Sequence, residues 1–466
     1  MPRLFCAFAH HAILVLICGA CFGLGTVHRA FAKPPEHPNV LIVVADDLRA
    51  DCVGALGDGR VKTPNIDGLF QRGFAFRNAY CLGANQGAVC TPSRNMLISG
   101  QAYFRWKGKM ASADGPSLPA AFKAAGYETY RDGKAHNVAT AINALFDHNQ
   151  SLANDEQERT SGEPGHTITD RAIRFLDRRS TQDESSQKPF CMLLEYEAPH
   201  DPRVADPKYL AMHERDKIAL PKNYRPVHPF DNGEMTVRDE QLASWPRTED
   251  EIRRHLHEYY AVISGFDSHV GRLLATLDRL KLRDETLIVF LSDHGLAIGS
   301  HGLMGKQNLY EVGMKAPLVF CGPGVPHGES QALVYLYDIL PTVCDLAGVK
   351  IPADEDGKSL ASIIAGRADR VRNSLFTAYR DVQRAVRDDR WKLIRYPKIN
   401  RSQLFDLQND PDEIHDLAAE PAQADRIAQL TALMQRWQKE YGDSAPLVVE
   451  NPTDGKFTPP TRVGKQ

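Results

Sequence analysis

Two pairs of polar residues, far apart in the sequence, are suited to binding a divalent cation. Asp46 and Asp47 are adjacent acids, and Asp293 is followed directly by His294. Carboxylate oxygens are the hard donors that calcium and magnesium prefer, and an imidazole is a less usual fourth ligand. Asp46 and Asp47 alone would also fit a helix cap or a solvated turn. Together the four residues predict a metal site.

Short apolar runs precede both pairs, and a third such run precedes a histidine. Val40–Val44, Phe190–Leu194 and Leu287–Leu291 have the length expected of strands buried on both faces of a sheet. The polar residues that follow them are Asp46-Asp47, Ala198-Pro199-His200 and Asp293-His294-Gly295. In open α/β sheets, ligands bind beyond the carboxyl ends of the strands, so we expect one polar site at one edge of the sheet.

Helical patterns separate the apolar runs. Ser117–Ala125 and Thr169–Arg178 have helical spacing, and Thr248 with Glu251 predicts a capping box that opens a long helix toward Leu280. Alternating strands and helices predict an α/β domain with a largely parallel sheet.

After about residue 375 the sequence predicts a smaller α+β domain. Its β-like segments are Leu375–Tyr379, Arg384–Val386, Trp391–Ile394 and Gln403–Phe405. An amphipathic helix follows over Ala424–Tyr441, with one apolar face made of Ile427, Leu430, Leu433, Met434 and Trp437. From Val449 we expect no regular structure. The expected organisation is a signal peptide (1–32), a catalytic domain (33–374), the smaller domain (375–448) and a tail (449–466).

The composition is that of a globular protein. The 466 residues are 42% hydrophobic and 25% charged, with a formal net charge of -3, which excludes a disordered chain, a polytopic membrane protein and a nucleic-acid binder with a broad basic surface. Arg3, the apolar run 12–24 and Ala30-Phe31-Ala32 are typical of a secretory signal peptide. A membrane anchor is the alternative, although the run is shorter than the about 20 residues that span a bilayer. We therefore expect export to the periplasm or the extracellular space, with no stable membrane span after signal cleavage.

Cysteines are too few to be the main source of stability. Six of the nine remain after removal of the signal peptide, which carries Cys6, Cys18 and Cys21. Three lie in apolar segments and are expected to be buried: Cys191, Cys321 and Cys344. The sequence leaves open whether Cys52 pairs with Cys81.

Cys90 lies in a motif with a specific chemistry. The sequence reads Cys90-Thr91-Pro92-Ser93-Arg94 and ends at Leu97-Ile98-Ser99-Gly100. It resembles the motif of the type I sulfatases, in which C-x-P-S-R marks a cysteine that is converted to formylglycine. From the residues alone, a free or disulfide-bonded cysteine in a loop is the alternative.

Further segments occur in the order found in this family. They are Gly126-Tyr127 with Gly133-Lys134-Ala135-His136, Ala198–Pro202, Ser292–Gly295 with Lys306, and Trp391–Ile394 with Leu404–Leu407 and Asp410-Pro411. His294 replaces a frequent asparagine, which favours the branch of iduronate-2-sulfatase and its bacterial relatives. Asp132, Ala135 and Ser99 depart from the usual residues and leave the substrate preference open. The resemblance implies an alkaline-phosphatase-like sandwich with a large, mostly parallel sheet and a smaller C-terminal α+β domain.

The resemblance also implies roles for individual residues. A calcium ion would be held by Asp46, Asp47, residue 90, Asp293 and His294. The sulfate group would be bound by Lys134, His200 and Lys306. Residue 90, as hydrated formylglycine, would attack sulfur, carry a covalent sulfate and release it by elimination. Arg94 would orient residue 90, His136 would assist the release, and His200 would protonate the leaving alcohol.

The expected function is therefore that of an exported sulfatase acting on a sulfated saccharide, matured by a formylglycine-generating enzyme. The alternatives are a phosphodiesterase or phosphonate monoester hydrolase of the same superfamily, and a non-catalytic glycan-binding protein that retains the fold. Because every candidate substrate carries sulfate, we expect discrimination from side chains outside the sulfate pocket, among them Tyr103–Lys109, Arg203 and Tyr379-Arg380.

Overall fold

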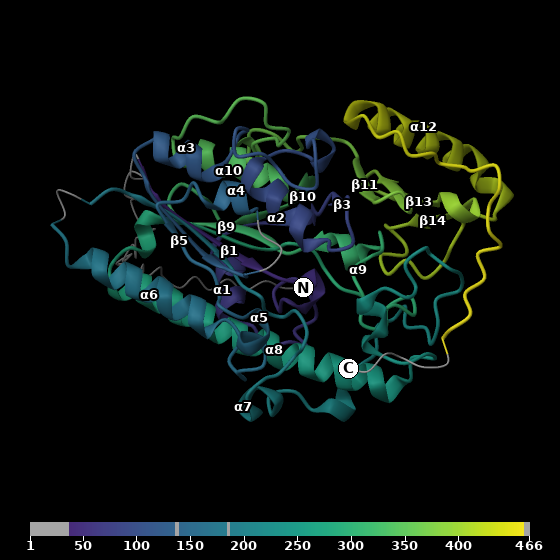
Figure 1. Ribbon diagram of the computed structural model, residues 1–466, viewed down its shortest axis with the longest axis horizontal. Helices are drawn as coiled ribbons and strands as arrows, with labels where there is room; N and C mark the ends of the chain where they lie inside the picture. The colour runs from purple at the N-terminus through teal and green to yellow at the C-terminus, as the bar shows by residue number, and fades with distance from the viewer. Residues whose placement is uncertain (1–36, 136–138, 184–186, 461–466) are drawn as a thin grey trace, which may run out of the picture. The chain divides into compact units, whose positions relative to one another are not determined.

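A computed structural model describes residues 37–135, 139–183 and 187–460 of the chain (Figure 1). The signal peptide expected over residues 1–32 lies outside these described residues. Within them, no helix combines the length and the apolar character that crossing a membrane requires.

A nine-stranded, mostly parallel sheet forms the centre of the larger part of the chain. Its path is β10 (Gly328–Tyr335), β2 (Phe74–Tyr80), β9 (Leu318–Cys321), β7 (Thr286–Ser292), β1 (Asn39–Ala45), β6 (Phe190–Glu195), β4 (Glu128–Gly133) and β5 (His148–Asn149), with β8 (Lys315–Ala316) paired to β2. The three apolar runs seen in the sequence are β1, β6 and β7, which are adjacent and parallel. The expected α/β class is confirmed.

Alternate residues of β1 enter two different apolar cores, which explains its unbroken apolar sequence. Val40, Ile42 and Val44 pack in one core with residues of α2 (Cys90–Ser99), α3 (Leu118–Ala124) and α10 (Ile339–Leu346). Leu41 and Val43 pack in the other core with residues of α1 (Pro64–Arg72), α6 (His166–Ser180) and α8 (Glu249–Arg279). Figure 1 shows these two groups of helices on opposite sides of the sheet. The α-helices are α1 (Pro64–Arg72), α2 (Cys90–Ser99), α3 (Leu118–Ala124), α4 (Thr140–Asn143), α5 (Asp155–Arg159), α6 (His166–Ser180), α7 (Pro207–Leu210), α8 (Glu249–Arg279), α9 (Glu311–Met314), α10 (Ile339–Leu346), α11 (Ala361–Ile364) and α12 (Ala424–Tyr441).

The start of the long helix α8 differs in detail from the capping box expected there. Thr248 Oγ1 accepts a hydrogen bond from the Glu251 N–H at 3.3 Å, as expected. The Glu251 carboxylate instead accepts from the Ser244 N–H at 3.3 Å, because the preceding segment folds back over the start of the helix.

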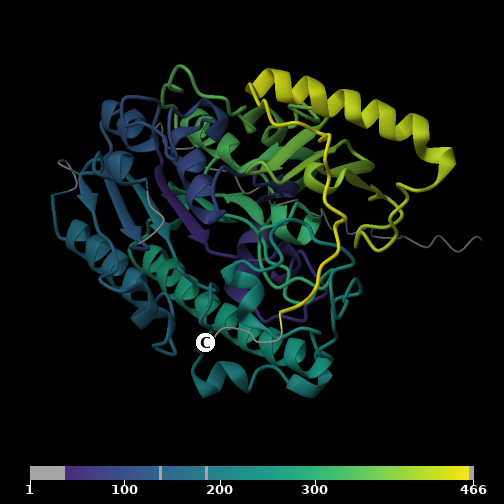
Figure 2. The same ribbon diagram turned by 45° about the vertical axis from the view of Figure 1, so that its right-hand side comes forward.

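The smaller C-terminal domain is a second sheet covered by one helix. Its strands run in the order β14 (Arg401–Asp406), β13 (Trp391–Tyr396), β12 (Gln383–Arg387), β11 (Leu375–Tyr379) and β3 (Gly83–Ala84). Figure 2 shows α12 lying across this sheet. The expected apolar face is confirmed, because Leu430 and Met434 are buried and Ile427, Leu433 and Trp437 pack around them. In the described part of the tail, to residue 460, no helix or strand forms.

The strand β3 was not expected, and it connects the smaller sheet to the segment that precedes Cys90. Gly83 pairs with Ala378 and has a φ of 108°, which favours glycine. A Cβ at Gly83 would lie 2.0 Å from the Ala378 carbonyl oxygen. Only glycine therefore allows this close approach.

The cysteines outside the motif form no disulfides within the described residues. Those that are buried and free are Cys52, Cys81, Cys191, Cys321 and Cys344. The pairing of Cys52 with Cys81 that the sequence left open is therefore absent.

Candidate active site

The ends of neighbouring strands bring the predicted polar residues together. Asp46 follows β1 and Asp293 follows β7. The pairing of these two strands extends to their ends, where the Asp293 N–H donates a hydrogen bond to the Ala45 carbonyl at 3.1 Å. On the other side of β1, the Asp46 N–H donates to the Ala198 carbonyl at 3.0 Å, next to the His200 segment that follows β6. These three segments therefore share one edge of the sheet. The hydrogen bond from the Ser292 hydroxyl to the Ala45 carbonyl joins two residues that lie 247 positions apart in the sequence.

Four of the predicted ligands form one buried cluster. The ligand atoms of Asp46, Cys90, Asp293 and His294 all lie within 4.8 Å of one another. Asp47 lies beside this cluster, since its N–H donates to Asp293 Oδ1 at 3.2 Å. The atoms Oδ1 of Asp46 and Nε2 of His294 are buried and have no hydrogen-bond partner among the described residues. Buried polar atoms without partners are unfavourable, so the donor set fits a cation that would satisfy both.

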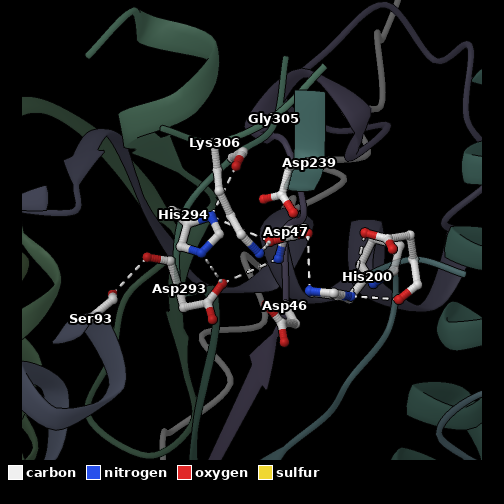
Figure 3. Close-up of polar contacts among 12 residues, drawn as sticks. Asp46, Asp47, Ser93, His200, Asp239, Asp293, His294, Gly305 and Lys306 are labelled. Carbon is white, nitrogen blue, oxygen red and sulfur yellow. Dashed lines mark hydrogen bonds and ion pairs between the residues drawn. The ribbon is translucent and has the colours of Figure 1, made fainter. Parts of the chain in front are cut away.

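Three cationic side chains contact the acids of this cluster, and Figure 3 shows one of them, Lys306, beside Asp47. Arg94 donates from Nε to Asp293 Oδ2 at 3.0 Å, and its Nη2 lies 3.4 Å from Asp46 Oδ2. Lys134 binds Asp46, and Lys306 Nζ donates to Asp47 Oδ1 at 2.8 Å. All three cations are nearly inaccessible to solvent. Each lysine is therefore held in the buried cluster by electrostatic attraction to its aspartate.

The charges shift the acid and base equilibria in the cluster. Burial alone would raise the pKa of Asp46, but Lys134 and Arg94 hold that pKa well below its usual range. Burial raises the pKa of Asp47 to about 6, even though Lys306 opposes the shift. Burial disfavours the charged form of His294, yet Asp293 raises the pKa of His294 to about 9. The acids, the cations and His294 in this cluster therefore shift one another's proton equilibria.

His200 lies at the edge of this cluster. Its Nδ1 donates to the carbonyl of Asp201 at 2.6 Å, which leaves Nε2 as the free nitrogen, 4.0 Å from Asp47 Oδ2. Burial, helped by Lys134 and Lys306, holds the pKa of His200 well below its usual range. Burial and the two lysines therefore favour the neutral imidazole, and Nε2 lies on the side of the acids.

Cys90 is the first residue of α2, where the unpaired N–H groups and the helix dipole favour negative charge. Ser93, three residues later, donates to the Asp293 carbonyl at 2.7 Å and fixes the helix start against the end of β7 (Figure 3). His136, the remaining predicted catalytic residue, lies outside the described residues.

Sequence reasoning missed a short segment that supports the site. Three consecutive charged residues of the 3-10 helix η5 (Arg238–Leu242) contact different parts of the active site. Arg238 binds both carboxylate oxygens of Asp201, directly after His200. Asp239 accepts from Gln307 Nε2 at 2.8 Å, and Glu240 accepts from the N–H groups of Met304 and Gly305, directly before Lys306. The segment joins no predicted strand, so no periodic pattern indicated it.

The side chains expected to discriminate between substrates differ in their placement. Tyr103 donates to the Ala378 carbonyl and Tyr379 to the Gly87 carbonyl, so both hydroxyls serve the fold. Arg380 is bound to Glu234 at 2.8 Å. Arg203 lines a pocket beside the His200 segment.

Comparison with known proteins agrees with this geometry. The family described as Sulfatase matches residues 38–349, and the family described as N-sulphoglucosamine sulphohydrolase, C-terminal, matches residues 299–440. Choline-sulfatase of Rhizobium meliloti is 28% identical over 460 residues, which cover 88% of this chain and 88% of that protein. Iduronate 2-sulfatase of Homo sapiens is 27% identical over 419 residues, which cover 72% of this chain and 74% of that protein.

A solved structure extends the comparison to the fold. Phosphonate monoester hydrolase of Agrobacterium radiobacter has a TM-score of 0.74 and 20% identity, with 87% of this chain and 96% of that chain covered. The alkaline-phosphatase-like architecture expected from the sequence is thereby confirmed. Because the Sulfatase family match spans most of the chain and includes every described residue of the buried cluster, the chain belongs to the sulfatase family, whose members hydrolyse sulfate esters.

Proposed function

We propose that this protein is an exported sulfatase that removes sulfate from a sulfated saccharide, with calcium and a formylglycine derived from Cys90. The observation that carries the proposal is the position of Cys90 among Asp46, Asp293 and His294, at the start of a helix and beside three buried cations. A cysteine with a purely structural role would not require the acids, the imidazole and the buried cations that surround Cys90.

The cations are suited to a sulfate ester, which is itself an anion. A calcium ion at Asp46, Asp47, residue 90, Asp293 and His294 would neutralise the carboxylates and attract the sulfate oxygens. With the carboxylates so neutralised, Lys134 and Lys306 would be able to bind those oxygens as well, since both already lie in the site. Arg94 would keep its hold on Asp293 and so fix α2 in place.

Residue 90 and His200 would divide the remaining chemistry. Formylglycine at position 90 would supply the hydroxyl that attacks sulfur. His200 would give a proton to the leaving alcohol through Nε2, the nitrogen that faces the site. The negative charge of a bound sulfate ester would raise the pKa of His200 from well below its usual range and so favour protonation before the alcohol leaves. His136 would assist the release of sulfate, a role that comes from the family resemblance.

The saccharide substrate is supported by the C-terminal family match and by the likeness to iduronate 2-sulfatase. Choline-sulfatase is named for a different alcohol, so the class of alcohol needs a direct comparison. Export is supported by the N-terminal segment 1–32, and conversion of Cys90 requires a formylglycine-generating enzyme as a maturation partner.

The decisive experiment combines mass spectrometry of the peptide containing Cys90 with turnover of matched esters. For protein purified from a cell that makes formylglycine, we expect the loss of the thiol mass and its replacement by an aldehyde or its hydrate. An aryl sulfate should be hydrolysed faster than the matching aryl phosphonate, and sulfated monosaccharides faster than choline sulfate. Faster phosphonate turnover would favour the alternative function suggested by the fold shared with phosphonate monoester hydrolase. An unmodified Cys90 with full sulfatase activity would contradict the mechanism, and turnover of no ester would favour a glycan-binding protein.

Metal analysis tests the assignment of calcium separately. We expect stoichiometric calcium and loss of activity on chelation, restored by calcium. Stoichiometric zinc, with full activity after calcium removal, would contradict the assignment.

A further inference from the structure

A pocket of about 630 Å³ lies next to the His200 segment. Its walls are the loop 201–204, the 3-10 helix η5, the side of α8 and one residue of α5. Three arginines line it: Arg203, Arg238 and Arg254. The pocket therefore has the positive groups that an anion would need.

Two of the three arginines already have carboxylate partners. Arg238 binds both oxygens of Asp201, and Arg254 donates from Nη1 to Glu258 at 2.9 Å. Arg203 has no carboxylate within ion-pair distance among the residues that the structure describes. Its Nε donates weakly to the Pro199 carbonyl at 3.4 Å. Arg203 is thus the cation in the pocket whose charge is left to a ligand.

Arg203 is buried, so water cannot fully solvate its charge. The residue is 8% exposed, and its Nη2 is buried with no hydrogen-bond partner among the described residues. Its guanidinium lies over the ring of Tyr259, with Cζ 5.3 Å from the ring centre. A buried charge without a partner is unfavourable, and cation–π contact relieves only part of this cost. Asp201 attracts Arg203 only from beyond ion-pair distance, so an anionic ligand would give this guanidinium a direct partner.

Two contacts connect Arg203 to the site of the reaction. The Tyr259 hydroxyl donates to the Asp47 carbonyl at 2.5 Å, so the ring under Arg203 supports a predicted metal ligand. The Pro199 carbonyl that Arg203 contacts immediately precedes His200, the proposed proton donor to the leaving alcohol. The pocket therefore lies on the side where the alcohol part of a substrate would leave.

We propose that this pocket binds a second anionic group, a carboxylate or another sulfate, on the saccharide whose sulfate ester is cleaved. The proposal rests on the proposed function. Arg203 makes the ionic contact, and the apolar surfaces of Pro202, Leu242 and the 40% exposed Val204 pack against the carbons of the sugar. Glu156 also lines the pocket and forms no ion pair with a basic residue in the described part of the chain, but it is exposed, so water and salt screen its charge.

The test compares wild type with Arg203→Gln, Arg203→Lys and, as a control, Arg279→Gln, which removes an arginine paired with Asp177 at the surface of the same helix α8. The substrates are a sulfated hexuronide, the matching hexoside without the carboxylate, the hexoside with a second sulfate, and 4-nitrophenyl sulfate. Arg203→Gln should lower kcat/KM by about 10- to 100-fold for the carboxylate or the disulfated substrate, whichever the pocket accepts. The neutral hexoside and the aryl sulfate should change by less than about threefold. Arg203→Lys should restore much of the loss, and Arg279→Gln should match wild type.

A second variant guards against misfolding of Arg203→Gln. Val204→Trp fills the mouth of the pocket and leaves Arg203 in place, and its partly exposed position tolerates a larger side chain. It should lower turnover of the anionic saccharides and spare the aryl sulfate. Equal losses on all substrates in both variants, or no change in the ratio of anionic to neutral substrate turnover, would overturn the proposal.

Calorimetric binding of the free hexuronate, compared with the neutral hexose, separates this inference from the proposed function. Binding of the hexuronate to wild type and its loss in Arg203→Gln would support the pocket even if no sulfate ester were hydrolysed. Hydrolysis of sulfate esters with no preference between the two sugars in either assay would leave the function intact and overturn the pocket.

Discussion

Nε of Arg94 donates to Oδ2 of Asp293 across 3.0 Å, and this bond joins two sequence motifs that lie 199 residues apart. Arg94 also donates from Nη2 to the Tyr196 carbonyl at 2.9 Å and lies within ion-pair distance of Asp46 and Glu195. One guanidinium therefore spans the ends of β1, β6 and β7, and it holds α2 against the edge of the sheet where these strands end.

Loss of this guanidinium should destabilise the fold as well as the site. Arg94→Met would remove the cation that bonds to the buried Asp293 and lies within ion-pair distance of Asp46 and Glu195, which costs about 3 to 5 kcal/mol of unfolding free energy. Urea denaturation in the presence of a chelator measures the loss. Arg77→Met, which breaks the partly exposed pair with Glu329, is the control and should cost at most about 1 kcal/mol. A loss below about 1 kcal/mol in Arg94→Met would contradict the central role of this residue.

Glu240 should act on turnover through the segment that presents Lys306. Its carboxylate accepts from the N–H groups of Met304 and Gly305 and pairs with Arg247 at 2.9 Å. Glu240→Gln replaces one acceptor oxygen by a donor, so we expect a loss of about 1 to 3 kcal/mol of stability and about tenfold in kcat/KM for an aryl sulfate. Glu249→Gln at the exposed start of α8 should change neither quantity. Reduced stability with unchanged kcat/KM at a temperature where the variant is folded would show that Glu240 does not position Lys306.

Glu197 should make stability fall as pH rises. This side chain is fully buried, and neither carboxylate oxygen has a hydrogen-bond partner among the described residues. Burial, with a smaller contribution from Glu158, raises the pKa of Glu197 from 4.5 to about 8. Above pH 4.5 the unfolded state loses a proton that the folded state keeps. The contribution of Glu197 to stability is therefore complete below pH 4.5 and is lost as pH rises through about 8. Over this range the free energy of unfolding should fall by about 1.4 kcal/mol per pH unit.

The variant Glu197→Gln removes this titration. Relative to wild type, it should gain about 2 to 3 kcal/mol in unfolding free energy between pH 6 and pH 8. Glu440→Gln, on the exposed side of α12, should follow the wild-type profile. A difference between wild type and Glu197→Gln that stays constant over this pH range would show that Glu197 ionises normally.

The sequence predicted the parts of the site that depend on local pattern. Apolar runs indicate β1, β6 and β7, and because parallel strands end at one edge of a sheet, the sequence places Asp46, His200 and Asp293 together. Arg94, Lys134 and Lys306 were identified by resemblance alone, because nothing in the spacing of a lone cation distinguishes a site residue from a surface residue.

The features of the site that the sequence did not predict depend on packing between segments that are distant in the sequence. Asp239 and Glu240 belong to a long irregular stretch, and their contacts with Met304, Gly305 and Gln307 follow from where that stretch docks. Gly83 joins the smaller sheet through a two-residue strand, too short to produce any periodic signal. Arg203 could be named as a specificity residue, but only its burial and its missing partner indicate an anionic ligand.

Cys90→Ser tests the proposed chemistry most directly. Cys90 is 1% exposed and serine is similar in size, so the variant should fold nearly as well as wild type, and the ligands Asp46, Asp293 and His294 are kept. A serine hydroxyl can attack sulfur, but it lacks the second hydroxyl that drives elimination of sulfate. We therefore expect slow formation of a persistent sulfate ester on residue 90, detected by mass spectrometry of the peptide after incubation with substrate, and no multiple turnover. Cys344→Ser, a buried position in α10, should turn over normally and carry no adduct.

If Cys90 were structural, its serine variant would form no adduct and its activity would fall only as far as its stability does. Turnover of Cys90→Ser at the wild-type rate would rule out the formylglycine mechanism.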